Sequence, residues 1–207
     1  MYSKRKIISL IGLLMIISLT FISCSAVNEK DIDLSDIDDM NIGTEMPEIL
    51  YGDDEKIIMH GTFGILTYNY KEEKVTQRVN YDAFGDLTNS ILYYRASKDG
   101  KRIFILSLDG QLVEQKIYEY NLSSSKLTAF EGDVNEEACS QSIFTADENN
   151  QFIENFGGSY LQSNTYLKKD NSILFLKADS SWQMKTLQLV EYDMNSNKEL
   201  KVIDIFK

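Results

Sequence analysis

The stretch Asp99-Gly100-Lys101-Arg102-Ile103-Phe104, followed by Ile117-Tyr118-Glu119-Tyr120-Asn121-Leu122, decides the fold class of this chain. It has the pattern of an Asp-Gly turn, an apolar strand, and a second strand that ends in Tyr-Asx before a polar turn. Lys126-Leu127 then begins another strand. An Asx side chain at such a turn accepts hydrogen bonds from its own turn backbone. We therefore expect a β-hairpin unit in this part of the chain.

The same order of residues occurs twice more. Tyr68-Asn69-Tyr70 precedes Lys74-Val75, and Tyr192-Asp193-Met194 precedes Lys198. Short β-branched or aromatic runs alternate with turn signals, and no segment sustains helical periodicity over three turns. The expected strands cover residues 57–59, 63–70, 91–94, 103–108, 117–122, 173–176, 187–192 and 202–206. The sequence predicts an all-β fold of about three four-stranded antiparallel repeats.

The repeat unit resembles one blade of bacterial β-propellers of the TolB or WD-like kind. The resemblance covers residues 50–207 and implies a propeller-like domain over residues 46–207, with an insertion around residues 131–160. Closed propellers usually carry four to eight blades. Three units therefore imply a partial propeller, a propeller completed by another subunit, or a twisted stack of sheets. The run Met46–Asp53 also resembles extracytoplasmic segments of clostridial membrane proteins of the β-lactam-sensor type, which implies a sensory or accessory role.

The first 24 residues have the pattern of an export signal. Lys4-Arg5-Lys6 precede an apolar stretch, and Phe21-Ile22-Ser23-Cys24 ends it with a small residue before the cysteine. This resembles the lipobox of bacterial lipoproteins. The resemblance implies that residues 1–23 are a signal peptide and that Cys24 becomes a lipidated N-terminus, with diacylglyceryl and palmitate chains, at the outer face of the cytoplasmic membrane. An uncleaved transmembrane anchor and a simple secreted form are the alternatives.

Residues 24–45 are predicted to form an acidic flexible linker, because they are short of aromatic residues and lack sustained periodicity. The chain has 21 basic and 32 acidic side chains, a net charge of −11, and removal of Lys4, Arg5 and Lys6 leaves 18 basic ones, or about −14. Such a surface repels phosphate backbones, so we expect no nucleic-acid partner. Alternating Asp31 and Asp33 suggest a calcium loop, but the turn glycine and the closing glutamate are absent, so no metal site is predicted.

The common catalytic motifs are absent from the sequence. His60 is the only histidine, and we expect a structural role for it. No Gly-x-Ser-x-Gly, Ser-x-x-Lys, phosphate loop or His-Glu-x-x-His occurs. Once Cys24 is acylated, Cys139 is the one thiol left, and together with His60 it cannot supply a zinc site. Cys139 is expected to be a half-buried thiol near a strand, or to pair with another chain. We predict no catalytic residue and no cofactor.

Binding is the remaining class of function. The chain has 12 tyrosines and one tryptophan, and most of them are expected to pack within sheets. The candidates for ligand contact are Tyr160, at the end of the glycine loop Asn155–Tyr160, and Trp182, at an expected hairpin tip. We predict a membrane-anchored extracytoplasmic lipoprotein that acts as a non-catalytic binding, accessory or sensory module. Its partner would be an envelope protein or a second copy. The alternatives are a glycan- or peptide-binding lipoprotein with an aromatic groove, and a carboxylate-based hydrolase.

Overall fold

The structure is a computed structural model that describes residues 32–34, 37, 47–89, 91–108, 115–139, 160–167, 172–178 and 187–206. The expected signal peptide, Cys24, Trp182 and the glycines of the 155–160 loop lie outside these described residues. No helix in the described ranges has the length and the apolar character that a membrane crossing requires.

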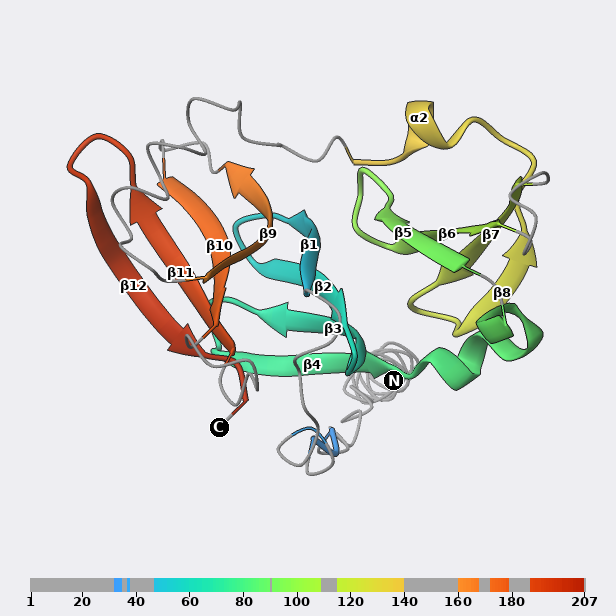
Figure 1. The fold of residues 1–207 in the computed structure, drawn as a ribbon, viewed down its shortest axis with the longest axis horizontal. Coiled ribbons are helices and arrows are strands. Elements are labelled where there is room, and N and C mark those ends of the chain that lie inside the picture. Colours follow the sequence, from blue (N-terminus) through green and yellow to red (C-terminus); the bar gives the residue numbers. More distant parts are fainter. Residues whose placement is uncertain are drawn as a thin grey trace, which may run out of the picture. The chain divides into compact units, whose positions relative to one another are not determined.

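The described strands form three antiparallel sheets of four strands each (Figure 1). Within each sheet, strands that follow one another in the sequence pair with each other. The first sheet has β1 (Glu48–Gly52), β2 (Lys56–Gly61), β3 (Gly64–Asn69) and β4 (Lys74–Val79). The second has β5 (Ile91–Ala96), β6 (Arg102–Leu108), β7 (Gln115–Asn121) and β8 (Lys126–Ala129). The third has β9 (Tyr160–Leu167), β10 (Ser172–Ala178), β11 (Leu187–Asp193) and β12 (Lys198–Asp204). The predicted all-β fold with three four-stranded repeats is confirmed.

Two short helical elements were not expected from the sequence. The 3-10 segment η1 (Tyr81–Asn89) follows β4, and α2 (Val134–Glu137) follows β8. The segment 131–139, which the sequence analysis placed in an insertion, is thus partly ordered into a helical turn. Asp133 caps α2, because its side chain accepts a hydrogen bond from the backbone N–H of Asn135.

The three Tyr-Asx turns have the geometry that the repeat predicts. The Oδ1 atom of Asn69 accepts hydrogen bonds from the N–H groups of Lys71 and Glu72, at 3.0 and 2.9 Å. Asn121 and Asp193 make the corresponding bonds at their own turns. Each turn contains one non-glycine residue with a left-handed φ of 52° to 54°, and these residues are Glu73, Ser125 and Asn197. The recurring sequence pattern therefore encodes one recurring turn.

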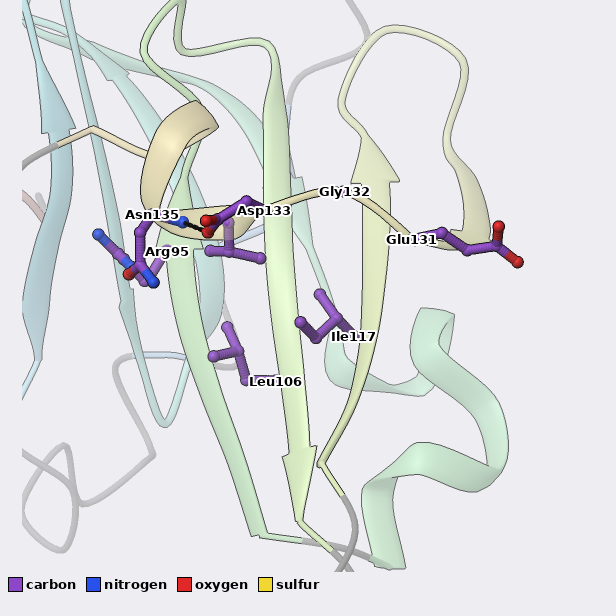
Figure 2. A pocket seen from close by; sticks show the side chains of 8 residues that line it. Arg95, Leu106, Ile117, Glu131, Gly132, Asp133 and Asn135 are labelled. Atoms are coloured by element: carbon purple, nitrogen blue, oxygen red, sulfur yellow. Dashed lines mark hydrogen bonds between the residues drawn. The ribbon is translucent and has the colours of Figure 1, made fainter.

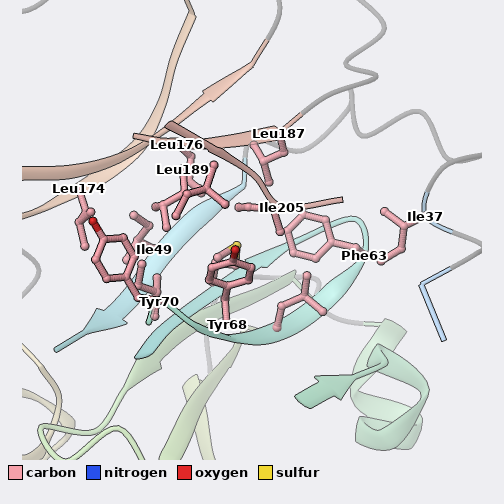
Figure 3. Packing of buried hydrophobic residues seen from close by; sticks show 14 residues of the cluster. Ile37, Ile49, Phe63, Tyr68, Tyr70, Leu174, Leu176, Leu187, Leu189 and Ile205 are labelled. Carbon is pink, nitrogen blue, oxygen red and sulfur yellow. The ribbon is translucent and has the colours of Figure 1, made fainter. Parts of the chain in front are cut away.

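The sheet β1–β4 contributes to two separate cores through alternate residues. Ile57 and Met59 of β2 pack in a cluster with residues of β10–β12, among them Leu176 and Leu189 (Figure 3). Ile58, between them, packs in a second cluster with Ile103 and other residues of β5–β7. Because side chains alternate between the faces of a strand, the apolar run in β2 is buried on both faces. The sheet β1–β4 thus packs against both other sheets.

Part of the segment expected to be a linker contacts this core. Ile37 is fully buried and belongs to the cluster that β2 shares with β10–β12, and Leu34 packs against the same cluster (Figure 3). The carbonyl oxygen of Asp33 accepts a hydrogen bond from Nη1 of Arg78 at 3.0 Å. These few apolar residues within an acidic stretch therefore add to the domain core.

Candidate functional site

A groove of about 600 Å³ lies on the outer face of the sheet β5–β8, which is the face turned away from the core shared with β1–β4 (Figure 2). Its volume falls within the roughly 300–1,000 Å³ that is usual for ligand sites. The residues that line it come from β5, β6, β7 and the segment after β8, and they are Arg95, Leu106, Ile117, Glu131, Gly132, Asp133, Val134 and Asn135.

The apolar floor of the groove is formed by Leu106 and Ile117, and Tyr93, beside the groove, continues this row onto a third strand. Tyr93 of β5 is opposite Leu106 of β6, and Leu106 is opposite Ile117 of β7. Leu106 and Ile117 are partly buried, and Tyr93 is 55% exposed, one of the few large apolar side chains in the described residues with such exposure. The adjacent row holds Phe104, which is fully buried beneath Val134 and Ala138. Among the described residues, the segment after β8 therefore covers Phe104 and leaves Leu106 and Ile117 only partly buried.

The segment 131–135 forms the wall of the groove. Backbone hydrogen bonds attach residues 137–139, which come next in the sequence, to the end of β5 and the turn after it. The N–H of Cys139 donates to the carbonyl of Ala96 at 2.8 Å, and the N–H of Lys98 donates to that of Glu137 at 3.0 Å. Gly132 allows a close approach within the wall, since a Cβ atom there would lie 2.5 Å from Cζ of Phe130. The wall is thus anchored at the α2 end by these backbone bonds, and at the other end by Phe130, whose ring centroid lies 4.8 Å from that of Phe104.

Charged groups lie at the two ends of the groove. Nη1 of Arg95 donates to Oδ1 of Asn135 at 2.8 Å, and the two side chains meet near α2, whereas Glu131 lies at the opposite end (Figure 2). Neither Arg95 nor Glu131 forms an ion pair with another residue of the described ranges. Arg102, just outside the groove, differs because it pairs with Glu137 at 2.7 Å and Glu119 at 3.0 Å. The hydrogen bond to Glu137 is the main reason that the pKa of Arg102 is raised.

Cys139 follows this wall segment and is half-buried beside β5, as the sequence predicts. Burial raises the pKa of its thiol, and the positive charges of Arg95 and Lys98 oppose that shift. The thiol is therefore protonated at neutral pH, which lowers its nucleophilicity.

His60 lies outside the groove. Its Nε2 atom is 3.3 Å from Oε2 of Glu48, and its ring centroid is 5.0 Å from that of Tyr94. The hydrogen bond with His60 lowers the pKa of the Glu48 carboxyl group, against the opposing effect of burial. These contacts join β1, β2 and β5. Within the described ranges, no three His, Cys, Asp or Glu side chains come together as a metal site would need.

Of the ligand-contact and lipidation residues singled out from the sequence, only Tyr160 is described, and it does not line this groove. Tyr160 is the first residue of β9 and pairs with Ala178, while Trp182 and Cys24 lie outside the described residues. The groove residues were missed, although the sequence carries one signal for them. The run Ile103-Phe104-Ile105-Leu106 is apolar on both faces of its strand, which indicates that both faces of this sheet need a covering layer.

Comparisons with known proteins leave the family of this chain open. No family model and no curated protein matches it. Among solved structures, the WD40 repeats of RRP9 superpose with a TM-score of 0.26 and 8% identity over 76% of this chain and 41% of that chain. The extracellular domain of a hybrid two-component system from B. thetaiotaomicron gives 0.24 and 16%, over 76% and 22%. The chain thus spans less than half of either structure. Structural similarity at these TM-scores does not indicate a function.

Proposed function

We propose that this chain is a membrane-tethered, extracytoplasmic binding module that docks onto an envelope protein through the outer face of β5–β8. The observation that carries the proposal is the groove, whose apolar floor (Leu106 and Ile117) is continued by the exposed Tyr93 beside it and lies next to a polar wall. Exposed apolar patches bordered by polar groups mark interaction sites. The proposal assigns no catalytic residue and no cofactor.

The tether in this proposal is the lipid on Cys24. The lipobox-like run that ends at this residue supports it, together with the acidic residues that follow. One acyl chain binds a membrane reversibly, whereas two or more give stable anchoring. A diacylglyceryl group with an added palmitate would therefore hold the module at the outer face of the cytoplasmic membrane.

The finer fold in this proposal is a partial propeller, with each four-stranded sheet as one blade. The packing of β1–β4 against both other sheets supports this reading, because propeller blades also bury both faces against neighbours. In such an arrangement the outer face of β5–β8 belongs to a terminal blade. None of the other described sheets covers the outer face of β5–β8, and the groove lies on that face.

The composition of the groove favours a protein segment over a glycan. A glycan site would present several aromatic faces with amide groups, whereas this groove has one amide side chain, Asn135, and an aliphatic floor. The arrangement of the carboxylates in the groove also does not favour a hydrolase that uses a pair of carboxylates. Asp133 caps α2, and the carboxylate of Glu131 lies far from it and points away (Figure 2).

Site-specific photocrosslinking in intact cell envelopes tests the proposal. p-Benzoylphenylalanine replaces Tyr93, beside the groove and opposite Leu106, or, as the control, Glu72 in the exposed turn between β3 and β4. We expect one dominant adduct from position 93, none of that mass from position 72, and loss of the adduct when Ile117→Arg disrupts the floor. An identical adduct from both positions, or none from position 93, would overturn the proposal.

A further inference from the structure

We infer that the groove on β5–β8 binds an extended peptide segment carrying an acidic, an apolar and a basic side chain in succession on one face. The acidic group contacts Arg95, the apolar group covers Leu106 and Ile117, and the basic group lies at Glu131. This inference rests on the proposed function, since it names the chemistry of the partner that docks in the same groove.

Arg95 supplies the positive end. Asn135 engages its Nη1 atom at 2.8 Å, which fixes the guanidinium group and leaves further N–H donors for a ligand. The nearby Arg102 has its guanidinium occupied by Glu119 and Glu137. Asp133, also in the lining, uses its Oδ1 atom to cap α2. A planar guanidinium held in place recognises a carboxylate through two parallel hydrogen bonds. The acidic side chain of the segment therefore belongs at this end.

The floor sets the size of the apolar element. Together with the adjoining Tyr93, the floor residues Leu106 and Ile117 form a row across three neighbouring strands. Strands lie about 4.8 Å apart, so the row is about 10 Å long, which is the length of about three extended residues. One aliphatic side chain from such a segment would cover Leu106 and Ile117. Burial of that side chain against Leu106 and Ile117 removes apolar surface of both partners from water and so favours binding.

Glu131 supplies the negative end. Its side chain is exposed, lies at the opposite end from Arg95 and points outward past that end in Figure 2, and has no ion pair in the described part of the chain. The basic side chain of the segment therefore extends past the floor to reach it. An exposed carboxylate adds little affinity on its own. Opposite charges at the two ends nevertheless determine which partner fits and in which direction it lies. The acidic character of the whole chain, with a net charge of −11, favours the approach of a segment with a basic end.

The test is a binding assay with designed peptides and the full chain in detergent solution. The probe is fluorescein-labelled Gly-Glu-Ser-Leu-Ser-Lys-Gly, whose Glu, Leu and Lys point to one face when the peptide is extended. We expect saturable binding by fluorescence anisotropy. Replacing the Leu of the probe by Ser should weaken binding at least tenfold, and replacing its Lys by Glu should weaken binding about threefold to tenfold. The protein variant Arg95→Gln should abolish the discrimination between Glu and Ser at the acidic position.

A charge exchange gives the decisive comparison. The variant Glu131→Lys should invert the preference, so that the probe with Glu in place of its Lys binds more tightly than the original. The matched control is Glu136→Lys, which makes the same charge change at an exposed residue of α2 outside the groove. The control should leave the preference unchanged. Because both variants alter net charge equally, a long-range field cannot produce this difference.

Four results would overturn the inference, the first three of them in the peptide assay. The first is equal binding of the charge-altered probes, the second is inversion by both lysine variants, and the third is no binding of any probe. Sedimentation of the full chain as a dimer that excludes the probe would also overturn it, since a second copy would then fill the groove. If the crosslink from position 93 forms while the probes bind without charge preference, the inference fails and the proposed function stands. If that crosslink is absent, the proposed function itself fails.

Discussion

The Nζ atom of Lys56 donates a hydrogen bond of 2.6 Å to the carbonyl oxygen of Gly100, which lies 44 residues away in the sequence. The same lysine is 5.5 Å from the centroid of the Tyr51 ring. Gly100 has a φ of +60°, and a Cβ atom there would lie 2.5 Å from the Tyr51 ring. The Asp-Gly turn therefore does more than reverse the chain, because it also brings two sheets into contact.

We predict that Gly100→Ala destabilises the protein by about 2 kcal/mol or more. A left-handed conformation costs a residue with a Cβ atom about 1–2 kcal/mol, and the clash with Tyr51 adds to this cost. Urea unfolding of the full chain, followed by circular dichroism, measures the effect. Gly132→Ala is the matched control. It also creates a close contact, with the partly exposed Phe130, but without a positive φ. Equal losses in both variants would contradict the explanation.

The recurring Asx turn gives a second prediction. Asn121→Ala removes the acceptor for the N–H groups of Ser123 and Ser124. We expect a loss of about 1 kcal/mol, which is typical of such hydrogen bonds, whereas Asn121→Asp should keep most of the stability because it keeps the acceptor. Urea midpoints of the three proteins provide the measurement. If the aspartate variant lost as much as the alanine variant, the turn bonds would not be the cause.

The contrast between these turns and the groove indicates what the sequence can predict. The Tyr-Asx turns are local, so Asn69, Asn121 and Asp193 reveal them through spacing alone. The groove depends on the register between β6 and β7, which places Leu106 opposite Ile117, and on the path of the chain after β8. No local pattern specifies that path. The strand β9 was also missed, because its residues Gln162, Ser163 and Asn164 lack a run of apolar or β-branched residues.

The pair of Glu48 and His60 predicts a dependence of stability on pH. The folded-state pKa of Glu48 is lowered from 4.5, chiefly by the hydrogen bond with His60. The unfolded chain therefore binds this proton more readily than the folded protein does. The stabilisation from Glu48 is fully present above about pH 4.5, and it is lost as the pH falls through the lower folded-state pKa.

We therefore expect Glu48→Gln to be less stable than the wild type at pH ~6, with a gap that narrows by pH ~3 as the wild-type carboxylate becomes protonated. Urea midpoints at the two pH values give the comparison. Glu72→Gln, which alters an exposed carboxylate 3.0 Å from Lys74, serves as the control. A gap for Glu48→Gln that stayed constant with pH would rule out the linkage.

Tyr68 gives the last prediction. Its side chain is 1% exposed in the core between β1–β4 and β9–β12, and its hydroxyl group has no hydrogen-bond partner among the described residues (Figure 3). A buried polar group without a partner costs about 1–3 kcal/mol. Tyr68→Phe keeps the ring and removes the hydroxyl group. We expect it to stabilise the protein by about 1 kcal/mol at neutral pH, whereas Tyr93→Phe, at an exposed site, should change stability by less than about 0.5 kcal/mol.

The same substitution has a consequence at alkaline pH. Burial, with a smaller effect from the charge of Glu73, raises the pKa of Tyr68 to about 12. Above its ordinary value of 10.0 the unfolded chain loses this proton while the folded protein keeps it. The wild type should therefore lose stability as the pH rises from about 10 to 12. Tyr68→Phe lacks this contribution, so its advantage in urea unfolding should increase over that interval. An advantage that stayed constant would show that Tyr68 ionises equally in the folded and unfolded chains.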